Sequence, residues 1–314
     1  MSRRKVVIRA PARLHFGIVN PFNKKYRLYI SAGIAIDRPE TVVSVYPEEH
    51  LSFEGPRSSE VASRLKPLLE EYSLSRGRVV VERCSPKHVG LGSTTQLLLA
   101  SAHGLLLANG LRVNAVDVAK KIGIGRLSGV GTYVYSHGGF VVDSGKSEQS
   151  DFPRLLIRLE VPDHWRFVVL IPSGVGLDET RESRIFATSK SAPDELIWSA
   201  SYYLFSGVVP ALVEARFEEF SQSLAKLQET VGLMFSEYQG GVFARYSKTA
   251  VEALKGLGVR GIGQSSWGPA VYGAVNSHTE ALRIVESVRR SLSDVEAFIA
   301  CPANRGAEVK LTLE

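Results

Sequence analysis

Cysteine, long apolar runs and metal-binding motifs are scarce in this chain of 314 residues, and each scarcity excludes a class of protein. Two cysteines, Cys84 and Cys301, are too few for a disulfide framework or a zinc cluster, which favours a reducing compartment. No apolar run approaches the ~18 residues that a membrane span needs, and MSRRKVVIRAPARLHF lacks the apolar core of a signal peptide. The sequence contains no HExxH or similar histidine spacing, so we do not expect a transition-metal site. We therefore expect a cytoplasmic protein without a membrane partner.

Acidic residues are outnumbered by basic ones, which limits the partners that the chain can attract. The formal net charge is +6 and the isoelectric point is about 9.3, so anionic partners are favoured. Nucleic acids, anionic membranes and phosphorylated small molecules all fit this charge. Lys and Arg are dispersed along the chain, however, and no recognised DNA- or RNA-binding motif appears. We expect small-molecule substrates and no nucleic acid.

Predicted strands and helices are interleaved without a long linker, which indicates an α+β protein. Residues 5–10, 41–48 and 78–84 have the composition of strands, and residues 59–72 have the periodicity of a helix. The polar segment SEQSDFP, ending at Pro153, is the predicted domain junction. At this length, two domains that share a cleft are expected. We predict an N-terminal phosphate-binding domain at 1–150 and a C-terminal α/β domain at 151–314.

A glycine-rich loop, PKHVGLGSTTQ, lies between a predicted strand and a predicted helix over 94–108. Ser93 and Gln96 have the spacing of a capping box at the helix start. The loop is neither a Walker motif nor a Rossmann fingerprint. Glycines beside the free N–H groups of a helix N-terminus suit phosphate or pyrophosphate, although Ser93 could simply cap a core helix. The predicted phosphate-binding residues of this loop are Lys87, His88, Gly90, Leu91, Gly92, Ser93, Thr94, Thr95 and Gln96.

This loop resembles the P-x-x-x-G-L-G-S-S-A-A motif of the GHMP kinase superfamily. It is more similar to the branch of β-ribofuranosylaminobenzene 5′-phosphate synthases, which read H-x-G-L-G-S-x-T-Q. Four further segments fit that branch in the expected order: APARLHFGIVN, GRLSGVGTYVYSHGGFVVDSG, IPSGVGLDETRESRIF and GIGQSSWGPAVYG. The resemblance implies a two-domain GHMP-kinase-like fold. It also implies condensation of phosphoribosyl pyrophosphate with 4-aminobenzoate or a related benzoate, release of pyrophosphate and CO2, and a place in methanopterin biosynthesis. Asn20 stands where many of these synthases have an acidic residue.

The alternative is an ATP-dependent small-molecule kinase of the same superfamily. Such kinases commonly place an acidic residue beside the substrate hydroxyl, in the region that corresponds here to SGVGTYVY. No carboxylate lies between Arg126 and Tyr135, so a hydroxyl nucleophile would lack its usual assistant. A kinase would have to use a carboxylate elsewhere, with Asp37, Asp143 and Asp178 as candidates. We predict that the protein is not a kinase.

Carbon–carbon bond formation needs a pyrophosphate clamp, a shielded electrophile and a positioned aromatic ring. The glycine loop is the predicted clamp, with Mg²⁺ on the phosphate oxygens and Ser93 as a candidate metal ligand. A second anion-contacting loop contains Ser128 and Gly129. The predicted catalytic residues are Arg13, His15, Arg126, Gln264 and Trp267.

Each of these assignments has a plainer alternative. Arg13 and His15 alternate along an extended segment and could both face the cleft, or they could form a structural pair. Lys87 could be an exposed loop charge. Trp267 could line the acceptor site or belong to the core. We also expect a homodimer.

Overall fold

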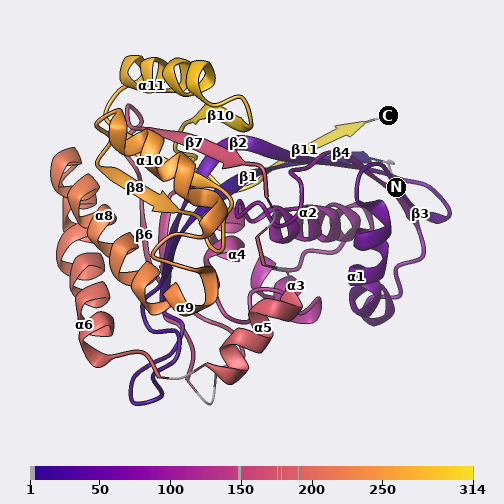
Figure 1. The fold of residues 1–314 in the computed structure, drawn as a ribbon. Coiled ribbons are helices and arrows are strands. Elements are labelled where there is room, and N and C mark those ends of the chain that lie inside the picture. The colour runs from indigo at the N-terminus through magenta and orange to yellow at the C-terminus, as the bar shows by residue number, and fades with distance from the viewer. Residues whose placement is uncertain (1–3, 148–149, 175, 178, 190, 314) are drawn as a thin grey trace.

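The computed structural model describes residues 4–147, 150–174, 176–177, 179–189 and 191–313. Its strands and helices are interleaved along the chain and form two separate β-sheets with helices packed against them (Figure 1). This arrangement confirms the predicted α+β class.

The first sheet has seven strands in the order β11-β1-β2-β4-β3, and β5 pairs with both β2 and β6. Two irregularities in the pairing of β1 with β2 flank the segment that carries Arg13 and His15. Such irregularities re-aim side chains at the edges of sites. The strands of this sheet are β1 (Arg4–Ile18), β2 (Ser31–Tyr46), β3 (Leu51–Glu54), β4 (Gly77–Arg83), β5 (Phe140–Asp143), β6 (Leu155–Leu159) and β11 (Glu308–Leu313).

Two strands from beyond residue 150 belong to this first sheet, because β6 pairs with β5 and β11 pairs with β1. The chain therefore returns to its N-terminal sheet at its end. The division at residue 150 stays a prediction.

The second sheet is antiparallel, in the order β10-β7-β9-β8. Along β7, Phe167 and Val169 pack into one hydrophobic cluster, whereas Val168 and Leu170 pack into another. Both faces of this strand are therefore covered, which explains its continuous apolar sequence. The strands are β7 (Arg166–Pro172), β8 (Gly261–Gln264), β9 (Val271–Val275) and β10 (Val295–Ala300).

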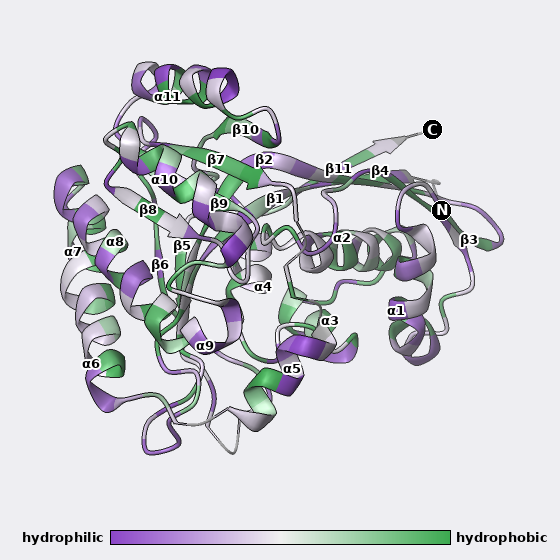
Figure 2. Ribbon diagram, viewed as in Figure 1, coloured by the Kyte–Doolittle hydropathy of each residue, from purple (hydrophilic) through white to green (hydrophobic). Residues whose placement is uncertain are grey.

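The helix after the glycine loop is apolar on most of its faces (Figure 2) and is buried against β1 and β2, which confirms the predicted helix. Helices of the first half are α1 (Ser58–Glu71), α2 (Ser93–Ala108), α3 (Ala115–Lys121) and α4 (Val130–His137). Helices of the second half are α5 (Glu179–Thr188), α6 (Asp194–Tyr202), the π-helix η1 (Tyr203–Val208), α7 (Val209–Val213), α8 (Phe217–Met234), α9 (Ser236–Gln239), the 3₁₀ turn η2 (Arg245–Ser247), α10 (Lys248–Gly256) and α11 (His278–Ser291).

Aromatic rings join the two sheets in one core. The ring of Phe16 on β1 lies 6.0 Å from Phe140 on β5 and 5.5 Å from Tyr272 on β9, measured between centroids. Tyr272 also contacts Phe167 of β7 at 6.4 Å. Burial of each such side chain contributes about 1.5–3 kcal/mol. This shared core holds β1 in a fixed position beside the second sheet.

One helical stretch of the described chain, Asp194–Val213, is long and apolar enough to cross a membrane, by length and composition only. This is weak evidence, because core helices of soluble proteins pass the same test. Its inner residues Ile197, Ala200, Leu204 and Val208 belong to the core cluster.

Candidate active site

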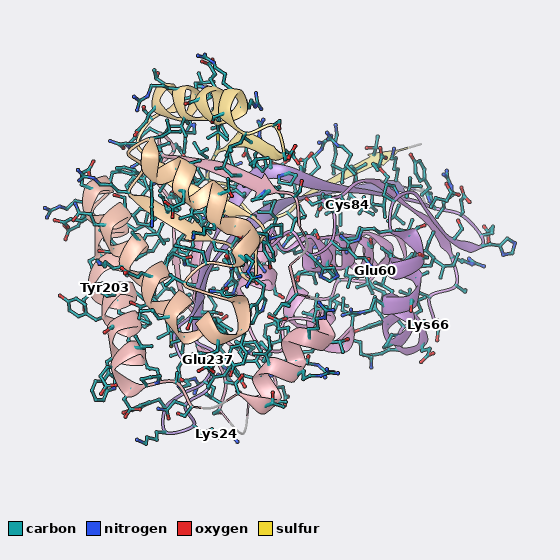
Figure 3. All side chains as sticks on the ribbon, viewed as in Figure 1. Lys24, Glu60, Lys66, Cys84, Tyr203 and Glu237 are labelled. Atoms are coloured by element: carbon teal, nitrogen blue, oxygen red, sulfur yellow. The ribbon has the colours of Figure 1, made fainter. Side chains whose placement is uncertain are left out.

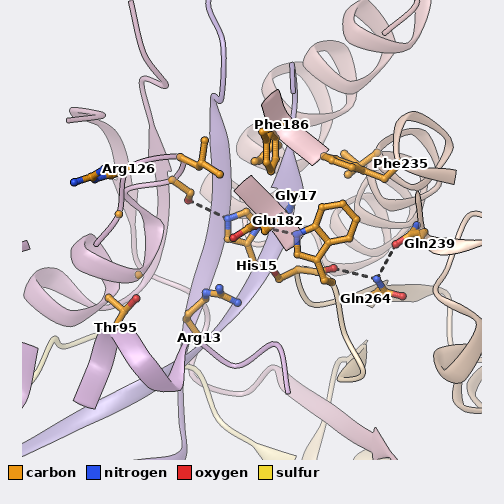
Figure 4. A pocket seen from close by; sticks show the side chains of 18 of the residues that line it. Arg13, His15, Gly17, Thr95, Arg126, Glu182, Phe186, Phe235, Gln239 and Gln264 are labelled. Carbon is orange, nitrogen blue, oxygen red and sulfur yellow. Dashed lines mark hydrogen bonds between the residues drawn. The ribbon is translucent and has the colours of Figure 1, made fainter. Parts of the chain in front are cut away.

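A cavity of about 280 Å³ lies where β1, the loop before α4, helices α5 and α8, and the turn after β8 meet (Figure 4). This volume is close to the lower end of the range for small-molecule sites. The predicted residues that line it are Arg13, His15, Thr95, Arg126, Ser128, Gln264 and Trp267. All five predicted catalytic residues therefore lie around one cavity, although they come from three separate segments of the chain.

The rest of the predicted phosphate loop does not line this cavity. Its backbone is instead fastened to β1 and to the turn after β8. The carbonyl of Gly90 accepts hydrogen bonds from Arg13 Nη1 at 2.7 Å and from Ser265 Oγ at 2.6 Å, and the carbonyl of Leu91 accepts from the Arg13 amide. The predicted residues outside the cavity lining are Lys87, His88, Gly90, Leu91, Gly92, Ser93, Thr94, Gln96 and Gly129.

Arg13 connects the loop to the cavity. Burial lowers the pKa of its guanidinium to about 10, and the nearby charge of Glu182 opposes that shift. The side chain therefore remains positively charged at neutral pH. A cation in a largely buried wall attracts a carboxylate or a phosphate more strongly than an exposed one would.

His15 is held as a neutral ring with one defined tautomer. The Gly17 amide donates to Nδ1 at 3.0 Å, so the ring proton is on Nε2, which lies 3.0 Å from Ser128 Oγ. Burial and, secondarily, the charge of Arg13 place the pKa of His15 well below its usual value. His15 therefore serves here as a hydrogen-bond donor to Ser128 and not as a cation.

The start of α2 differs from the predicted capping box. Gly92 is the N-cap residue, with φ 74°, and no side chain caps this helix. Ser93 is already helical and its hydroxyl donates to the Pro86 carbonyl, while Gln96 is buried and donates to the carbonyl of Gly131. The capping-box prediction was wrong because both side chains are used in tertiary contacts.

Arg57, which precedes α1, was not predicted from the sequence and contacts this helix start. Its guanidinium donates to Ser93 Oγ at 3.1 Å and to Thr94 Oγ1 at 2.7 Å. It also pairs with Glu60 at 2.8 Å, and Lys87 reaches the same carboxylate at 2.8 Å. Glu60 and Cys84 lie on the side of the molecule away from Tyr203 (Figure 3).

The arginine contact bears on the predicted metal ligand. A guanidinium 3.1 Å from Ser93 Oγ occupies the position and supplies the charge that a cation would bring, so Ser93 in this arrangement does not fit Mg²⁺. The described residues also contain no cluster of three or more His, Cys, Asp or Glu side chains suited to a metal.

The opposite wall of the cavity is aromatic. The half-buried ring of Trp267 lies 5.0 Å from that of Phe235, and Phe235 lies 6.0 Å from Phe186 of α5. Trp267 Nε1 donates to Glu182 Oε1 at 2.8 Å, which ties α5 to the turn after β8. Trp267 therefore belongs to the cavity lining, and its indole N–H is partnered.

Gln264 has a supporting position in this wall. Its amide group accepts from the Ala244 amide at 2.7 Å and donates to Gln239 Oε1 at 3.1 Å and to the Ser266 carbonyl at 3.0 Å. These bonds fix the turn that carries Trp267.

The chain is similar in sequence to a known protein family and to named proteins. The family model described as "GHMP kinases C terminal" matches residues 208–294. Two proteins named beta-ribofuranosylphenol 5′-phosphate synthase, from Methanothermobacter thermautotrophicus and Archaeoglobus fulgidus, are 27% and 28% identical to this chain. The alignments cover 96% and 97% of this chain and 98% and 99% of the relatives.

Residues 208–294 therefore resemble the C-terminal part of GHMP kinases, and the whole chain has the GHMP-kinase-like fold. Solved structures of the superfamily fold agree. Homoserine kinase from Cytophaga hutchinsonii superposes with a TM-score of 0.67 at 16% identity, covering 98% of this chain and 97% of the kinase. Mevalonate diphosphate decarboxylase from Enterococcus faecalis gives 0.68 at 16% identity, with 98% and 99% covered. At these identities the two structures show the shared fold.

A GHMP kinase would need a carboxylate beside its substrate. Among the described residues that line the cavity, Glu182 is the one carboxylate. Asp37 accepts from the Cys301 amide at 2.8 Å and does not line the cavity. Asp143 is fully buried behind Ser128. Asp178, the third candidate, lies outside the described residues.

Asn20 has a structural role. It is buried, its Nδ2 donates to the carbonyls of Asn23 and Arg27, and its Oδ1 accepts from the Asn23 amide. Both ends of the amide are therefore used to hold the loop between β1 and β2.

Proposed function

We propose that this protein transfers the phosphoribosyl group of phosphoribosyl pyrophosphate to a ring carbon of a para-substituted benzoate, with release of pyrophosphate and CO2. The observation that carries the proposal is the composition of the cavity. The lining combines Arg13 and Arg126 with the aromatic side chains of Trp267, Phe235 and Phe186. In Figure 4 the guanidinium of Arg126 points away from Phe186 and Phe235. Two anionic groups and one aromatic ring are what this reaction must bind.

The cavity suits each requirement of the reaction. The guanidinium of Arg13 adjoins the glycine loop, where it can stabilise charge on the departing pyrophosphate. The aromatic wall excludes water from the electrophilic ribose carbon and supplies a flat surface for the benzoate. The carboxylate must stay fixed until CO2 leaves, for which an arginine fork is well suited.

The acceptor remains to be chosen between two benzoates. The resemblance of the sequence favours 4-aminobenzoate, and the name of the relatives, which describes a ribofuranosylphenol, favours a benzoate that carries a hydroxyl. Both are proposed acceptors, and methanopterin biosynthesis is the proposed destination of the product. Mg²⁺ is proposed as a companion of pyrophosphate, whose oxygens would supply most of its ligands.

Carboxyl-labelled acceptors test this function directly. Purified protein is incubated with Mg²⁺, phosphoribosyl pyrophosphate and labelled 4-aminobenzoate or 4-hydroxybenzoate, and released CO2 is counted. In parallel, the protein is offered ATP with a panel of small alcohols. We expect labelled CO2 that depends on phosphoribosyl pyrophosphate and no phosphorylated alcohol. Efficient γ-phosphate transfer without CO2 release would refute the proposal.

The second candidate function is an ATP-dependent small-molecule kinase, which the fold shared with homoserine kinase favours. Phosphoryl transfer to a hydroxyl usually uses a nearby carboxylate to orient or deprotonate the nucleophile. Glu182 is the carboxylate in the described cavity lining, and Trp267 and Arg13 already engage it. The synthase is therefore the better supported function.

Trp267→Ala is expected to uncouple the release of pyrophosphate from the release of CO2. Loss of the ring opens the aromatic wall, so that water competes with the benzoate for the ribose carbon. The ratio of pyrophosphate released to CO2 released should rise above one, while the affinity for phosphoribosyl pyrophosphate changes little. Trp267→Phe, which retains a ring, is the matched control, and its ratio of pyrophosphate to CO2 should stay near one. A ratio of one in both variants would assign the acceptor wall to other residues.

A further inference from the structure

A chain of hydrogen-bonding groups leads from the cavity to the buried carboxylate of Asp143, which does not line the cavity. Ser128 Oγ lines the cavity and lies 2.7 Å from Ser31 Oγ, which in turn lies 2.6 Å from Asp143 Oδ2. His15 Nε2 lies 3.0 Å from Ser128 Oγ on the cavity side (Figure 4). The chain joins four groups from β1, β2, β5 and the loop before α4.

Asp143 is an unusual group to bury. It is 0% exposed, and its carboxylate accepts from the amides of Ser31, Gly129 and Gly145 at 3.2, 2.7 and 2.9 Å. Within the described residues it has no ion pair with a lysine or arginine. Burial raises the pKa of this carboxyl to about 6, although its hydrogen bonds oppose that shift. A group with this pKa exchanges a proton near neutral pH.

The tautomer of His15 sets the direction of the chain. Because the His15 proton is on Nε2 and points at Ser128 Oγ, the Ser128 hydroxyl proton is free to point at Ser31, and the Ser31 proton at Asp143. All donors then point toward the carboxylate. Ser128 Oγ also accepts from the Val130 amide at 3.3 Å, a long bond that a donor arriving in the cavity can replace.

We propose that Ser128, Ser31 and Asp143 form a proton relay that accepts the ring hydroxyl proton of a 4-hydroxybenzoate acceptor. This inference rests on the proposed function. Ser128 is the catalytic residue that touches the acceptor, and Ser31 and Asp143 act through it. Arg13 lies two residues before His15 on β1, about 6.8 Å away between Cα atoms, so it can hold the carboxylate at the other end of the ring.

The proton balance of the step is closed. As the ring carbon bonds to ribose C1 and pyrophosphate leaves with its electron pair, positive charge develops on the ring oxygen. The acceptor O–H then breaks, Ser128 takes that proton and passes its own to Ser31, and Ser31 passes its own to Asp143. Loss of CO2 leaves its bonding pair in the ring, and the proton returns to the phenolate product along the same relay. A free phenol has a pKa of about 10, so this transfer becomes favourable only as the carbon–carbon bond forms.

An amino-substituted acceptor does not need the relay to the same extent. Its nitrogen carries the developing charge as an iminium ion, which is stable while still protonated. A protonated ring oxygen is a much stronger acid and gains more from a base. The relay should therefore affect the two acceptors differently, which a purely structural role for these residues would not do.

The test compares CO2 release from the two labelled benzoates in wild type, Ser31→Ala and Asp143→Asn. General-base assistance is typically worth about 10²–10⁴-fold. Because Ser128 Oγ also lies 3.4 Å from Asp143 Oδ2, we expect Ser31→Ala to lower kcat for 4-hydroxybenzoate by about 10²-fold, at the low end of that range. For 4-aminobenzoate we expect a loss of less than about threefold. Ser144→Ala is the matched control, since Ser144 is a buried serine beside Asp143 but outside the relay. It should change neither rate.

The pH profile gives a second readout. Asp143 must be ionised to accept a proton, so kcat/KM for 4-hydroxybenzoate should fall as pH drops through about 6. Other ionisable groups near Asp143 are His15 across Ser128, Tyr133 of α4, Arg154 beside that tyrosine, and Arg27, which donates to Ser144 Oγ. Any change in the charge of His15, Tyr133 or the substrate phosphates affects both acceptors. The difference between the two profiles therefore isolates the relay.

The outcomes separate the relay from the proposed function. Absence of CO2 from both acceptors in wild type would refute the synthase and the relay together. Turnover of both acceptors, with equal losses in Ser31→Ala, would refute the relay alone. Ser31→Ala removes a single hydroxyl and leaves the backbone donors of Asp143 in place, so it keeps the test valid if Asp143→Asn does not fold.

Discussion

Gly92→Val is expected to lower kcat/KM for phosphoribosyl pyrophosphate by about 10³-fold while the protein remains folded, because it displaces a charge-stabilising group. Gly92 has φ 74°, and a Cβ built at this position would lie 2.7 Å from Arg13 Cγ. Carbon atoms do not approach so closely, so Arg13 must move. The bond from its side chain to the Gly90 carbonyl would be lost, so that only the bond from the Arg13 amide to the Leu91 carbonyl would join Arg13 to the loop.

Gly110→Val is the matched control for this prediction. Gly110 has φ 77°, and nothing lies within 4 Å of its Cβ position. Both variants therefore suffer the backbone strain of a left-handed residue, about 1–2 kcal/mol. Denaturation should show comparable losses of unfolding free energy, and steady-state CO2 release should show a loss of activity only in Gly92→Val. Equal activity in the two variants would contradict a role for this contact.

Much of the scaffold around these glycines was predictable from local sequence. Residues 78–84 and 94–108 have a strand composition and a helical apolar pattern, and the structure has β4 and α2 there. The alternation of Arg13 and His15 correctly indicated that both face the same side, since they line one cavity. Hydrophobic periodicity depends only on neighbouring residues, so it can be read from the sequence without knowledge of tertiary contacts.

The contacts made by distant segments were not predictable in this way. Arg57 lies 36 residues before Ser93, and no spacing relates the two. Glu182 and Phe186 are on α5, whose sequence is that of an ordinary amphipathic helix, yet both line the cavity. The capping-box pattern failed for the same reason, because tertiary partners for Gln96 outweighed a local bond. Side chains that reach across the fold are chosen by packing, which sequence spacing does not encode.

Arg13 lines the cavity and also binds the glycine loop, so we expect its replacement to cause the second large loss of activity. Arg13→Lys should lower kcat/KM for the benzoate by about 10³-fold, the upper range for loss of one preorganised charge-stabilising donor set. Lysine replaces a planar fork by a point charge. Its three N–H groups diverge from one nitrogen, so an ammonium that donates to the Gly90 carbonyl cannot also present the parallel pair of N–H groups that an arginine fork offers a carboxylate. The effect should include a higher KM for the benzoate.

Arg126→Lys is the matched comparison, because Arg126 also lines the cavity but is exposed. An exposed charge in water contributes less than a buried one, so we expect a loss of about tenfold or less. Kinetic constants for both substrates, measured by CO2 release in both variants, decide between the two arginines. A larger increase in benzoate KM for Arg126→Lys would make Arg126 the carboxylate ligand and leave Arg13 as the anchor of the glycine loop. A loss confined to phosphoribosyl pyrophosphate affinity in both variants would remove the arginines from acceptor binding, because a fork that holds a carboxylate must affect the substrate that carries it.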